Sequence, residues 1–286
     1  MFCSPVLPEK EGADRMVNRD HRKILLVDGQ IGYLGGRNIS DDYYRRWRDA
    51  DIRITGPAVE HLTRVYKRSQ DRVAPRSGGL YVADDLPERA LRDTVAYLEQ
   101  VRDATVQIVY DCPTDTLLPI RNCFEWAIGH AKEYFWFYNP YTPPPHSVLK
   151  ALKDAAARGV DVRWIVPANN DEAVERPMGE AIYRELLMAG VKIFEWQGNM
   201  NHTKQFMSDN YLTVIGSANM DNLSFFLNYE VLAIVYNEEA TRAAAGTFCS
   251  DVTGHCREIT LKEVNGWGHR HRLRNWLVRL VAGPIG

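Results

Sequence analysis

The sequence has no long apolar run, few cysteines and no excess of basic charge. A membrane-spanning helix needs about 20 consecutive apolar residues, and no run in the 286 residues approaches that length. The five cysteines are odd in number and lack the close pairs of a zinc site, so they are typical of reduced thiols. A formal net charge of −2 argues against a surface built throughout for nucleic acid.

The hydrophobic content of 45% is enough for an ordinary packed core, in one large domain or two modest ones. Period-two patterns and turn residues predict early strands at 22–27, 31–34 and 51–55, followed by a helix over 57–72. An exposed connection over 74–85 and a helix over 87–102 come next. From there strands and helices alternate as in βαβ units, with strands at 105–110, 134–138, 160–166, 191–196 and 229–236, and helices at 119–132, 147–157 and 179–189.

One spaced pattern occurs twice and organises the chain. Five positions of the first copy recur in the second with the same gaps between successive members, which indicates an internal repeat. The first copy holds His21, Lys23, Asp28, Asn38 and Asp49, and the second holds His202, Lys204, Asp209, Asn219 and Glu230.

The two copies differ in what precedes them. About a hundred residues of α/β pattern lie ahead of His202 in its half, whereas only twenty residues precede His21. We therefore expect the first half to be incomplete and the chain to be truncated at its N-terminus. Central strands of that half would then lack cover or partners.

The spacing also predicts which side chains act together. Side chains alternate along a strand, so His21 and Lys23 point the same way, as do His202 and Lys204. Asp28 and Asp209 lie an odd number of positions from their histidines, and we assign both a structural role. Asn38 and Asn219 follow small residues, which would let a ligand approach the backbone closely.

Two histidines, two lysines and two asparagines that converge by pseudo-symmetry suit a phosphodiester. Lysine and amide donors can hold the non-bridging oxygens without a metal. One histidine can attack phosphorus while the other protonates the departing alcohol and later activates the acceptor. Asp49 and Glu230, one per copy, would hydrogen-bond the second ring nitrogen of the histidines and fix the tautomer.

Both stretches match the HxKxxxxD signature, followed by GGRN or GSAN, and in this the sequence resembles the phospholipase D superfamily. NRDHRKILLVDGQIGYLGGRNISDDY and the block from NPYTPPPHSVLK to GSANMDNLSFFLNYE resemble the bacterial cardiolipin synthase branch in particular. The resemblance implies an α/β phospholipase D-like fold of two pseudo-symmetric halves, with mixed sheets flanked by helices. We place the rest of the first half at 1–104, the second half at 105–262 and a basic amphipathic tail at 263–286.

The resemblance also implies roles. His21 would be the nucleophile and His202 the general acid of a ping-pong mechanism through phosphohistidine. The lysines and asparagines of both copies carry over as phosphate ligands, and Asp49 and Glu230 as residues that orient the histidines. Ser217 matches the small polar residue of the second motif and Gly36 replaces it in the first, so we place both at the substrate. No cofactor and no metal are expected.

The expected function is therefore a phosphatidyltransferase of cardiolipin synthase type, which moves a phosphatidyl group from phosphatidylglycerol to a lipid hydroxyl. Three alternatives stay open: a phospholipase D that releases phosphatidic acid, an inactive truncated remnant or lipid-binding module, and, less favoured, a nuclease. The expected partners are a phospholipid substrate and an anionic membrane surface, not nucleic acid. The sequence does not give the oligomeric state.

The C-terminal tail carries a helical pattern with an apolar face. Leu273, Trp276, Leu277, Leu280 and Val281 share one face, and polar residues that include Arg272 and Asn275 lie opposite. Such a helix can lie in a membrane interface or dock on the domain, and the pattern leaves both open. Together with the resemblance, it predicts peripheral attachment at the cytoplasmic side of a bacterial inner membrane.

Overall fold

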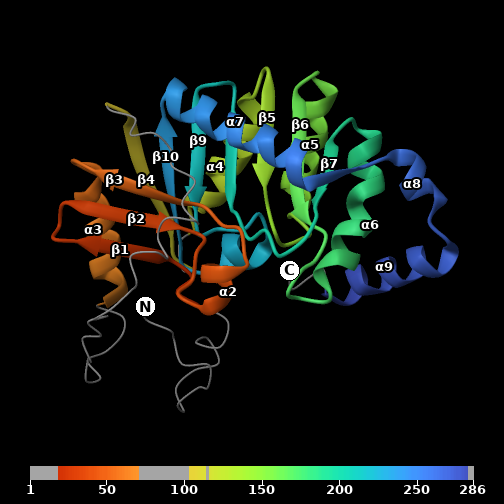
Figure 1. Cartoon of the computed structure of the whole chain (residues 1–286), viewed down its shortest axis with the longest axis horizontal. Coiled ribbons are helices and arrows are strands. Elements are labelled where there is room, and N and C mark those ends of the chain that lie inside the picture. Colours follow the sequence, from red (N-terminus) through yellow and green to blue (C-terminus); the bar gives the residue numbers. More distant parts are fainter. Residues whose placement is uncertain (1–18, 71–102, 114–115, 283–286) are drawn as a thin grey trace, which may run out of the picture.

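The computed structural model describes residues 19–70, 103–113 and 116–282, and Figure 1 shows two sheets side by side. The smaller sheet is antiparallel in the order β1-β2-β3. It consists of β1 (Lys23–Val27), β2 (Ile31–Gly35) and β3 (Asp51–Thr55). The tight turn between β1 and β2 holds Asp28 and Gly29 at positive φ. The short helix α2 (Asp41–Arg45) lies between β2 and β3, and α3 (Ala58–Gln70) follows β3.

The larger sheet has eight strands in the order β11-β7-β6-β5-β8-β9-β10-β4. Its parallel part, β5-β6-β7, is built by the predicted βαβ units, and the remaining pairs are antiparallel. The strands are β4 (Thr105–Asp111), β5 (Tyr134–Tyr138), β6 (Asp161–Pro167), β7 (Lys192–Trp196), β8 (Gln205–Ser208), β9 (Leu212–Gly216), β10 (Glu230–Tyr236) and β11 (Cys256–Ile259).

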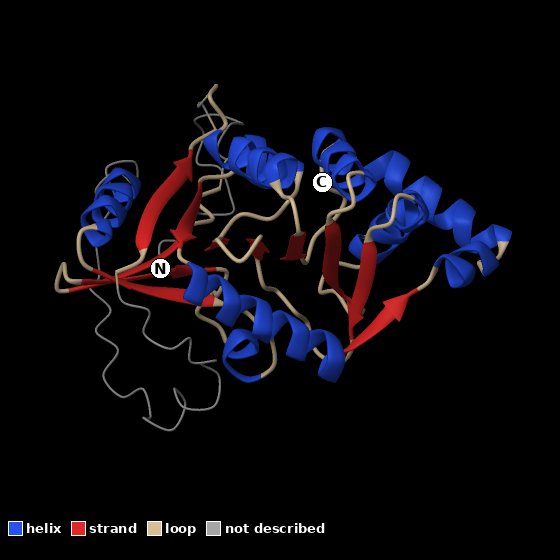
Figure 2. Ribbon diagram, turned by 90° about the horizontal axis from the view of Figure 1, so that it is seen from above, coloured by secondary structure: helices blue, strands red, loops and turns tan. Residues whose placement is uncertain are grey.

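Helices cover both faces of the larger sheet (Figure 2). One face packs on α4 (Pro119–His130), α5 (His146–Ala157) and α6 (Glu175–Met188), and the other on α7 (Glu238–His255). The chain ends with α8 (Leu261–Gly266) and α9 (His269–Ala282) beside α6. Within the described residues, no helix is long and apolar enough to cross a membrane.

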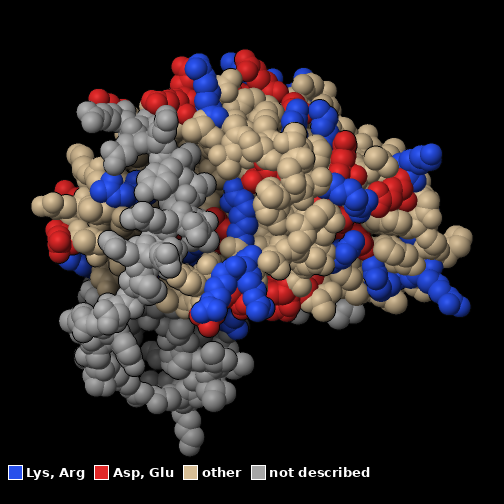
Figure 3. All heavy atoms as spheres, viewed as in Figure 1, with Lys and Arg blue, Asp and Glu red and all other residues tan. Residues whose placement is uncertain are grey.

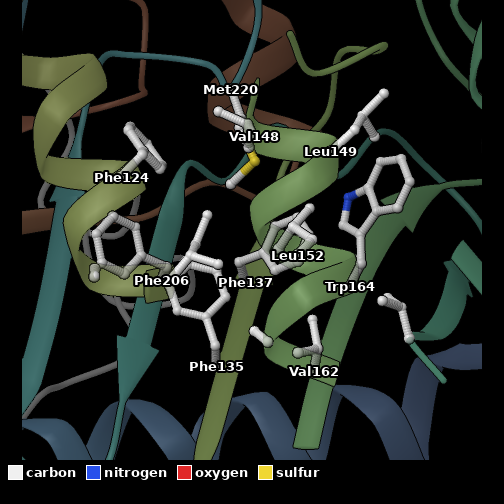
Figure 4. Packing of buried hydrophobic residues seen from close by; sticks show 14 of the residues in the cluster. Phe124, Phe135, Phe137, Val148, Leu149, Leu152, Val162, Trp164, Phe206 and Met220 are labelled. Atoms are coloured by element: carbon white, nitrogen blue, oxygen red, sulfur yellow. The ribbon is translucent and has the colours of Figure 1, made fainter. Parts of the chain in front are cut away.

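The main core lies between the sheet and the helices α4 and α5 (Figure 4). Phe135 and Phe137 of β5 and Phe206 of β8 are at most 1% exposed and meet Phe124 and Leu152 of the covering helices. Each such side chain contributes roughly 1.5–3 kcal/mol by leaving water. This packing makes the second half a rigid base for the residues that follow β7.

The repeat is visible in the arrangement of elements. β8, β9, β10 and α7 of the second half correspond to β1, β2, β3 and α3 of the first. However, β8 pairs on both sides, with β5 and β9, whereas among the described residues β1 pairs only with β2. Leu25 of β1 is 59% exposed, but Phe206 at the equivalent position is 1% exposed. Among the described residues, the small sheet thus has no strand beside β1 in the place that β5 takes beside β8.

The element predictions are confirmed within a few residues wherever the structure describes them, except that α6 begins four residues earlier than the predicted helix. The predicted connection over 74–85 and the helix over 87–102 lie outside the described residues. The proposed tail at 263–286 begins inside α8, and a break at 267–268 separates α8 from α9.

Candidate active site

The two repeat motifs meet where the two sheets adjoin, and backbone hydrogen bonds tie them together. The His21 N–H donates to the Tyr229 carbonyl at 3.0 Å, and the Tyr229 N–H donates to the Arg19 carbonyl at 2.8 Å. The same pattern recurs around the second motif, where the His202 N–H donates to the Arg48 carbonyl at 2.7 Å. Each histidine segment is therefore held against the segment that carries the acid of the other half.

The acids serve the histidines across the halves. His21 Nδ1 lies 2.8 Å from Glu230 Oε1, and His202 Nδ1 lies 2.9 Å from Asp49 Oδ2. The sequence predicts that these acids orient the histidines, and the geometry adds that each acid comes from the opposite copy. A carboxylate at Nδ1 holds the proton there, so Nε2 presents its lone pair to a reactant.

Each lysine lies beside its own histidine, although β1 begins only at Lys23 and β8 only at Gln205, so strand alternation does not account for it. Lys23 Nζ donates to the His21 carbonyl and Lys204 Nζ donates to the His202 carbonyl, both at 2.7 Å. Lys204 Nζ also lies 2.8 Å from both ring nitrogens of His202. Lys204 is only 4% exposed, and burial lowers its pKa to about 7 against the opposing attraction of Asp49.

The two histidines differ in access. The His21 side chain is 26% exposed, and that of His202 is 3% exposed. Burial lowers the pKa of His21, although Glu230 opposes this, so the imidazole is neutral and nucleophilic at pH 7. Burial and the nearby Lys204 hold the pKa of His202 well below its usual range.

The two acids also differ. Burial would raise the pKa of Glu230, but His21 and the hydrogen bond to it outweigh burial and lower that pKa. Ser217 Oγ and Ser224 Oγ donate to the Glu230 carboxylate at 2.5 and 2.9 Å. Burial raises the pKa of Asp49 to about 6. Glu230 is therefore the fully ionised partner, and Asp49 titrates closer to neutrality.

The asparagines stand beside this centre. Asn38 Nδ2 donates to the Tyr43 hydroxyl at 3.1 Å, and that hydroxyl lies 3.3 Å from the ring nitrogens of His202. The Asn219 N–H donates to Ser224 Oγ at 3.0 Å, and its buried side-chain Oδ1 has no hydrogen-bond partner within the described part of the chain. Their role as phosphate ligands stays a prediction.

The glycines before the asparagines allow close contacts within the protein itself. A Cβ on Gly35 would lie 2.4 Å from the Ala50 carbonyl, and one on Gly216 would lie 2.2 Å from the Val231 carbonyl. A Cβ on Gly36 would lie 2.5 Å from Asp49 Oδ1. The neighbouring strand and the acid fill the space where a Cβ would lie on these glycines. Close approach of a ligand to this backbone stays a prediction.

Ser217, predicted to contact substrate, is fully buried and donates its hydroxyl to Glu230. It thus helps to hold the carboxylate that faces His21, and Gly36 leaves room for the other acid in the first copy. Direct substrate contact by Ser217 or Gly36 stays a prediction.

The acidic residues at the strand turns lie on other contacts. Asp209 accepts hydrogen bonds from the backbone N–H groups of Lys132, Glu133 and Tyr134 at 2.9–3.0 Å. It thereby fixes the start of β5 against the end of β8. Asp28 occupies the equivalent turn with φ of 51° and is exposed.

Three aromatic residues near His202 were not among the predicted site residues. The rings of Tyr43, Trp47 and Tyr141 have their centroids 5.1, 5.7 and 5.6 Å from that of His202. They pack around the imidazole, and His202 is 2% exposed. Of the three, only Tyr141 could have been found from the sequence, because it follows a central strand, where α/β sheets place ligand-binding loops.

A family model described as "Cardiolipin synthase, PLD-like domain" matches residues 126–252, which include the second motif. The chain therefore carries a PLD-like domain of the phospholipase D superfamily over residues 126–252. Within this superfamily it is 32% identical to a cardiolipin synthase of Halalkalibacterium halodurans over 271 residues, which is 92% of this chain and 52% of that protein. It is 30% identical to cardiolipin synthase A of Pseudomonas syringae, over 93% of this chain and 54% of that protein.

The chain thus spans about half the length of the curated relatives it matches. Among solved structures, it is similar to phosphatidylserine synthase of Haemophilus influenzae, with a TM-score of 0.69 and 12% identity. That match covers 94% of this chain and 70% of the other. At this identity it shows the shared fold alone.

Proposed function

We propose that the protein is a phosphatidyltransferase of cardiolipin synthase type. It would transfer a phosphatidyl group from phosphatidylglycerol to a lipid hydroxyl by way of a phosphohistidine. The observation that carries the proposal is the pair of histidines, each with Nδ1 on a carboxylate of the opposite half and a lysine alongside. The names of the relatives at about 30% identity point to the same lipid chemistry.

In the first step, the lone pair of His21 Nε2 attacks phosphorus, and the bond from phosphorus to the glycerol oxygen breaks. His202 gives its proton to that oxygen, so that glycerol leaves neutral. In the second step, His202 takes the proton of the incoming lipid hydroxyl. The oxygen of that hydroxyl attacks phosphorus and releases His21 unchanged.

The difference in exposure between the two histidines supports His21 as the nucleophile and His202 as the acid. His21 is the more exposed ring, its Nδ1 faces the ionised Glu230, and its neutral form holds the free lone pair that a nucleophile needs. His202 must carry a proton when substrate binds. In the free protein, the positive charges of Lys204 and Lys23 help to depress the pKa of His202. The phosphodiester anion offsets these charges. Substrate binding therefore raises the pKa of His202 and prepares the acid.

The lysines and asparagines supply the electrostatic part. Lys23 and Lys204 would face the non-bridging oxygens, and Asn38 and Asn219 would donate amide hydrogens to them. Because the lysines lie beside both histidines, the charge is stabilised in both steps.

Incubation with phosphatidylglycerol labelled in the phosphate tests the proposal. We expect labelled cardiolipin together with unlabelled glycerol, and a labelled protein after rapid denaturation at mildly alkaline pH, at which phosphohistidine is stable. Phosphatidic acid as the main product would instead assign the hydrolase, in which water accepts the phosphatidyl group. Neither product and no labelled protein would overturn the enzymatic proposal and favour the inactive lipid-binding alternative.

The substrate places the enzyme at a membrane surface, because both phosphatidylglycerol and the acceptor lipid lie in a bilayer. We propose peripheral attachment to an anionic bilayer, at the cytoplasmic side of the bacterial inner membrane.

A further inference from the structure

Helix α9 is attached to the protein by its polar face. The carboxylate of Glu180 on α6, a residue only 5% exposed, receives three side chains of α9. Arg274 Nη2 and Asn275 Nδ2 donate to Glu180 Oε2 at 2.7 and 3.1 Å, and His271 Nε2 lies 2.8 Å from the same oxygen. Asn275 is 2% exposed. Charge-assisted hydrogen bonds therefore hold this face of α9 against α6.

The opposite face of α9 is apolar and points to solvent. Leu273, Trp276, Leu277 and Leu280 are 56%, 57%, 45% and 60% exposed. Their spacing of three, four and seven residues puts them on one stripe of the helix, which we call the α9 ridge. An amphipathic helix normally buries its apolar stripe and exposes its polar one. In α9 the orientation is reversed.

The α9 ridge stands apart from other exposed apolar groups. Every other helix within the described residues shows at most one large exposed apolar side chain. Isolated exposures are normal, whereas a contiguous stripe of leucines around a tryptophan marks an interaction surface. Trp276 also suits the boundary between water and lipid, because its ring has an apolar body and one N–H donor.

The charges beside the α9 ridge favour an anionic lipid surface over a second copy of the chain. Arg270 and Arg272 are exposed and, by the helical period, lie on the two sides of the stripe. Figure 3 shows Lys and Arg side chains at the surface where α9 lies in Figure 1. Two copies that met ridge to ridge would bring these like charges together. An anionic lipid surface would instead bury the leucines and Trp276 and pair the arginines with phosphates.

We propose that the α9 ridge is a docking surface for an anionic lipid bilayer. The helix lies in the plane of the headgroups with its ridge in the acyl boundary, and the Glu180 contacts transmit this attachment to α6 and the sheet. The inference rests on the proposed function only in that the lipid substrates share this membrane. Binding is measured without turnover, so the two proposals can fail separately.

The test is co-sedimentation with vesicles of phosphatidylcholine, with or without phosphatidylglycerol. A His21→Asn protein serves as the parent, so that phosphatidylglycerol is not consumed. On this parent, Leu273→Glu with Leu280→Glu, and separately Trp276→Glu, are expected to lower the partition coefficient about tenfold or more. The matched control is Trp126→Glu, which alters a tryptophan of α4 that is 51% exposed and is expected to leave binding unchanged.

A further variant of the same parent tests the role of charge, with Arg270 and Arg272 both replaced by glutamate. Each basic residue near an anionic surface is worth roughly 1 kcal/mol, or about fivefold in affinity. We expect this variant to lose its preference for phosphatidylglycerol and the wild-type preference to weaken at higher salt.

Three results would overturn the proposal: absence of vesicle binding by the parent, binding unchanged in both ridge variants, or a dimer that the ridge variants convert to monomer in light scattering. With intact His21, the ridge variants should still turn over a short-chain lipid below its micelle concentration. Vesicle binding without any phosphatidyl transfer would refute the enzymatic function alone.

Discussion

At the scale of single residues, the exchange of acids between the halves separates two roles that look alike in the sequence. Glu230 faces His21, and Asp49 faces His202. If His21 attacks and His202 protonates the leaving group, loss of each carboxylate should affect a different part of the first step.

We therefore expect Glu230→Gln to slow formation of the phosphoenzyme by about 10²–10⁴-fold with any substrate, because the tautomer of the nucleophile is lost. Asp49→Asn should slow it with phosphatidylglycerol but little with a nitrophenyl phosphodiester, whose leaving group needs no proton. Stopped-flow release of nitrophenol measures this directly. Glu60→Gln on the exposed face of α3 is the control, and the reverse pattern of defects would contradict the cross-half assignment.

Lys204 is costly to bury. Its pKa of about 7 in the folded protein, set by burial, lies far below the usual lysine value of 10.5. Below pH 7 the folded protein must therefore hold a charged lysine at a cost on the order of 5 kcal/mol. Lys204→Met should abolish transfer yet raise the free energy of unfolding at pH 6 by up to this amount, as urea titration would show.

The sign of the pH dependence follows from the same shift. Between about pH 7 and 10.5 the unfolded chain binds the Lys204 proton and the folded chain does not, so this lysine makes stability rise with pH. The rise should be missing in Lys204→Met. A variant less stable than wild type at pH 6, with an unchanged pH slope, would show that the lysine contributes more as a partner of Asp49 and His202 than it costs.

At the scale of elements, close contact between strands positions the acids. Gly216 ends β9 where β10 carries Glu230, and a Cβ on it would lie 2.2 Å from the Val231 carbonyl. Gly216→Ala should destabilise the protein by about 1–3 kcal/mol and displace Glu230. Gly246→Ala in α7 has open space around it and should stabilise by about 0.5–1 kcal/mol. Equal stability of the two variants in urea would contradict this account of the strand contact.

Local patterns in the sequence were enough for most strands and helices. The βαβ alternation over 134–196 predicted the parallel β5-β6-β7, because each element there has its own periodicity and turn residues. The strand at 105–110, placed in the same alternation, instead pairs antiparallel with β10 as β4. Helix α7 has a weak pattern, since its alanine-rich stretch at 243–246 has little amphipathic contrast, and sequence reasoning missed it. The four-residue β11 is too short to carry a pattern.

The site could be predicted as a set of residues but not as a set of contacts. The spacing identifies both histidines and both acids, yet only the tertiary arrangement decides that Glu230 reaches His21. The same holds for the ring of Tyr43 and for the outward face of α9, because both depend on which distant segment lies alongside. Gly35 and Gly216 show the converse, since a small residue signals a close neighbour without saying which one.

At the scale of the whole molecule, the candidate active site belongs to neither half alone. The backbone hydrogen bonds at His21 and His202, with the two histidine–carboxylate pairs, join the small sheet to the large one. Their shared apolar contact contains Leu34 and Ile54 from the first sheet and Ile215 and Val231 from the second. A phosphoryl group could therefore meet both histidines only when the two sheets are assembled.

The central claim is that His21, placed by an acid of the other half, becomes phosphorylated. The most direct measurement is trapping of label from phosphatidylglycerol by rapid denaturation at mildly alkaline pH, where the N–P bond of phosphohistidine survives. It compares the wild-type, His21→Ala and His202→Ala proteins, with the labelled residue located by peptide mapping at the same pH. The account predicts label on His21 in the wild type, none in His21→Ala, and label that forms slowly and persists in His202→Ala. Label on His202, retained in His21→Ala and absent from His202→Ala, would contradict it.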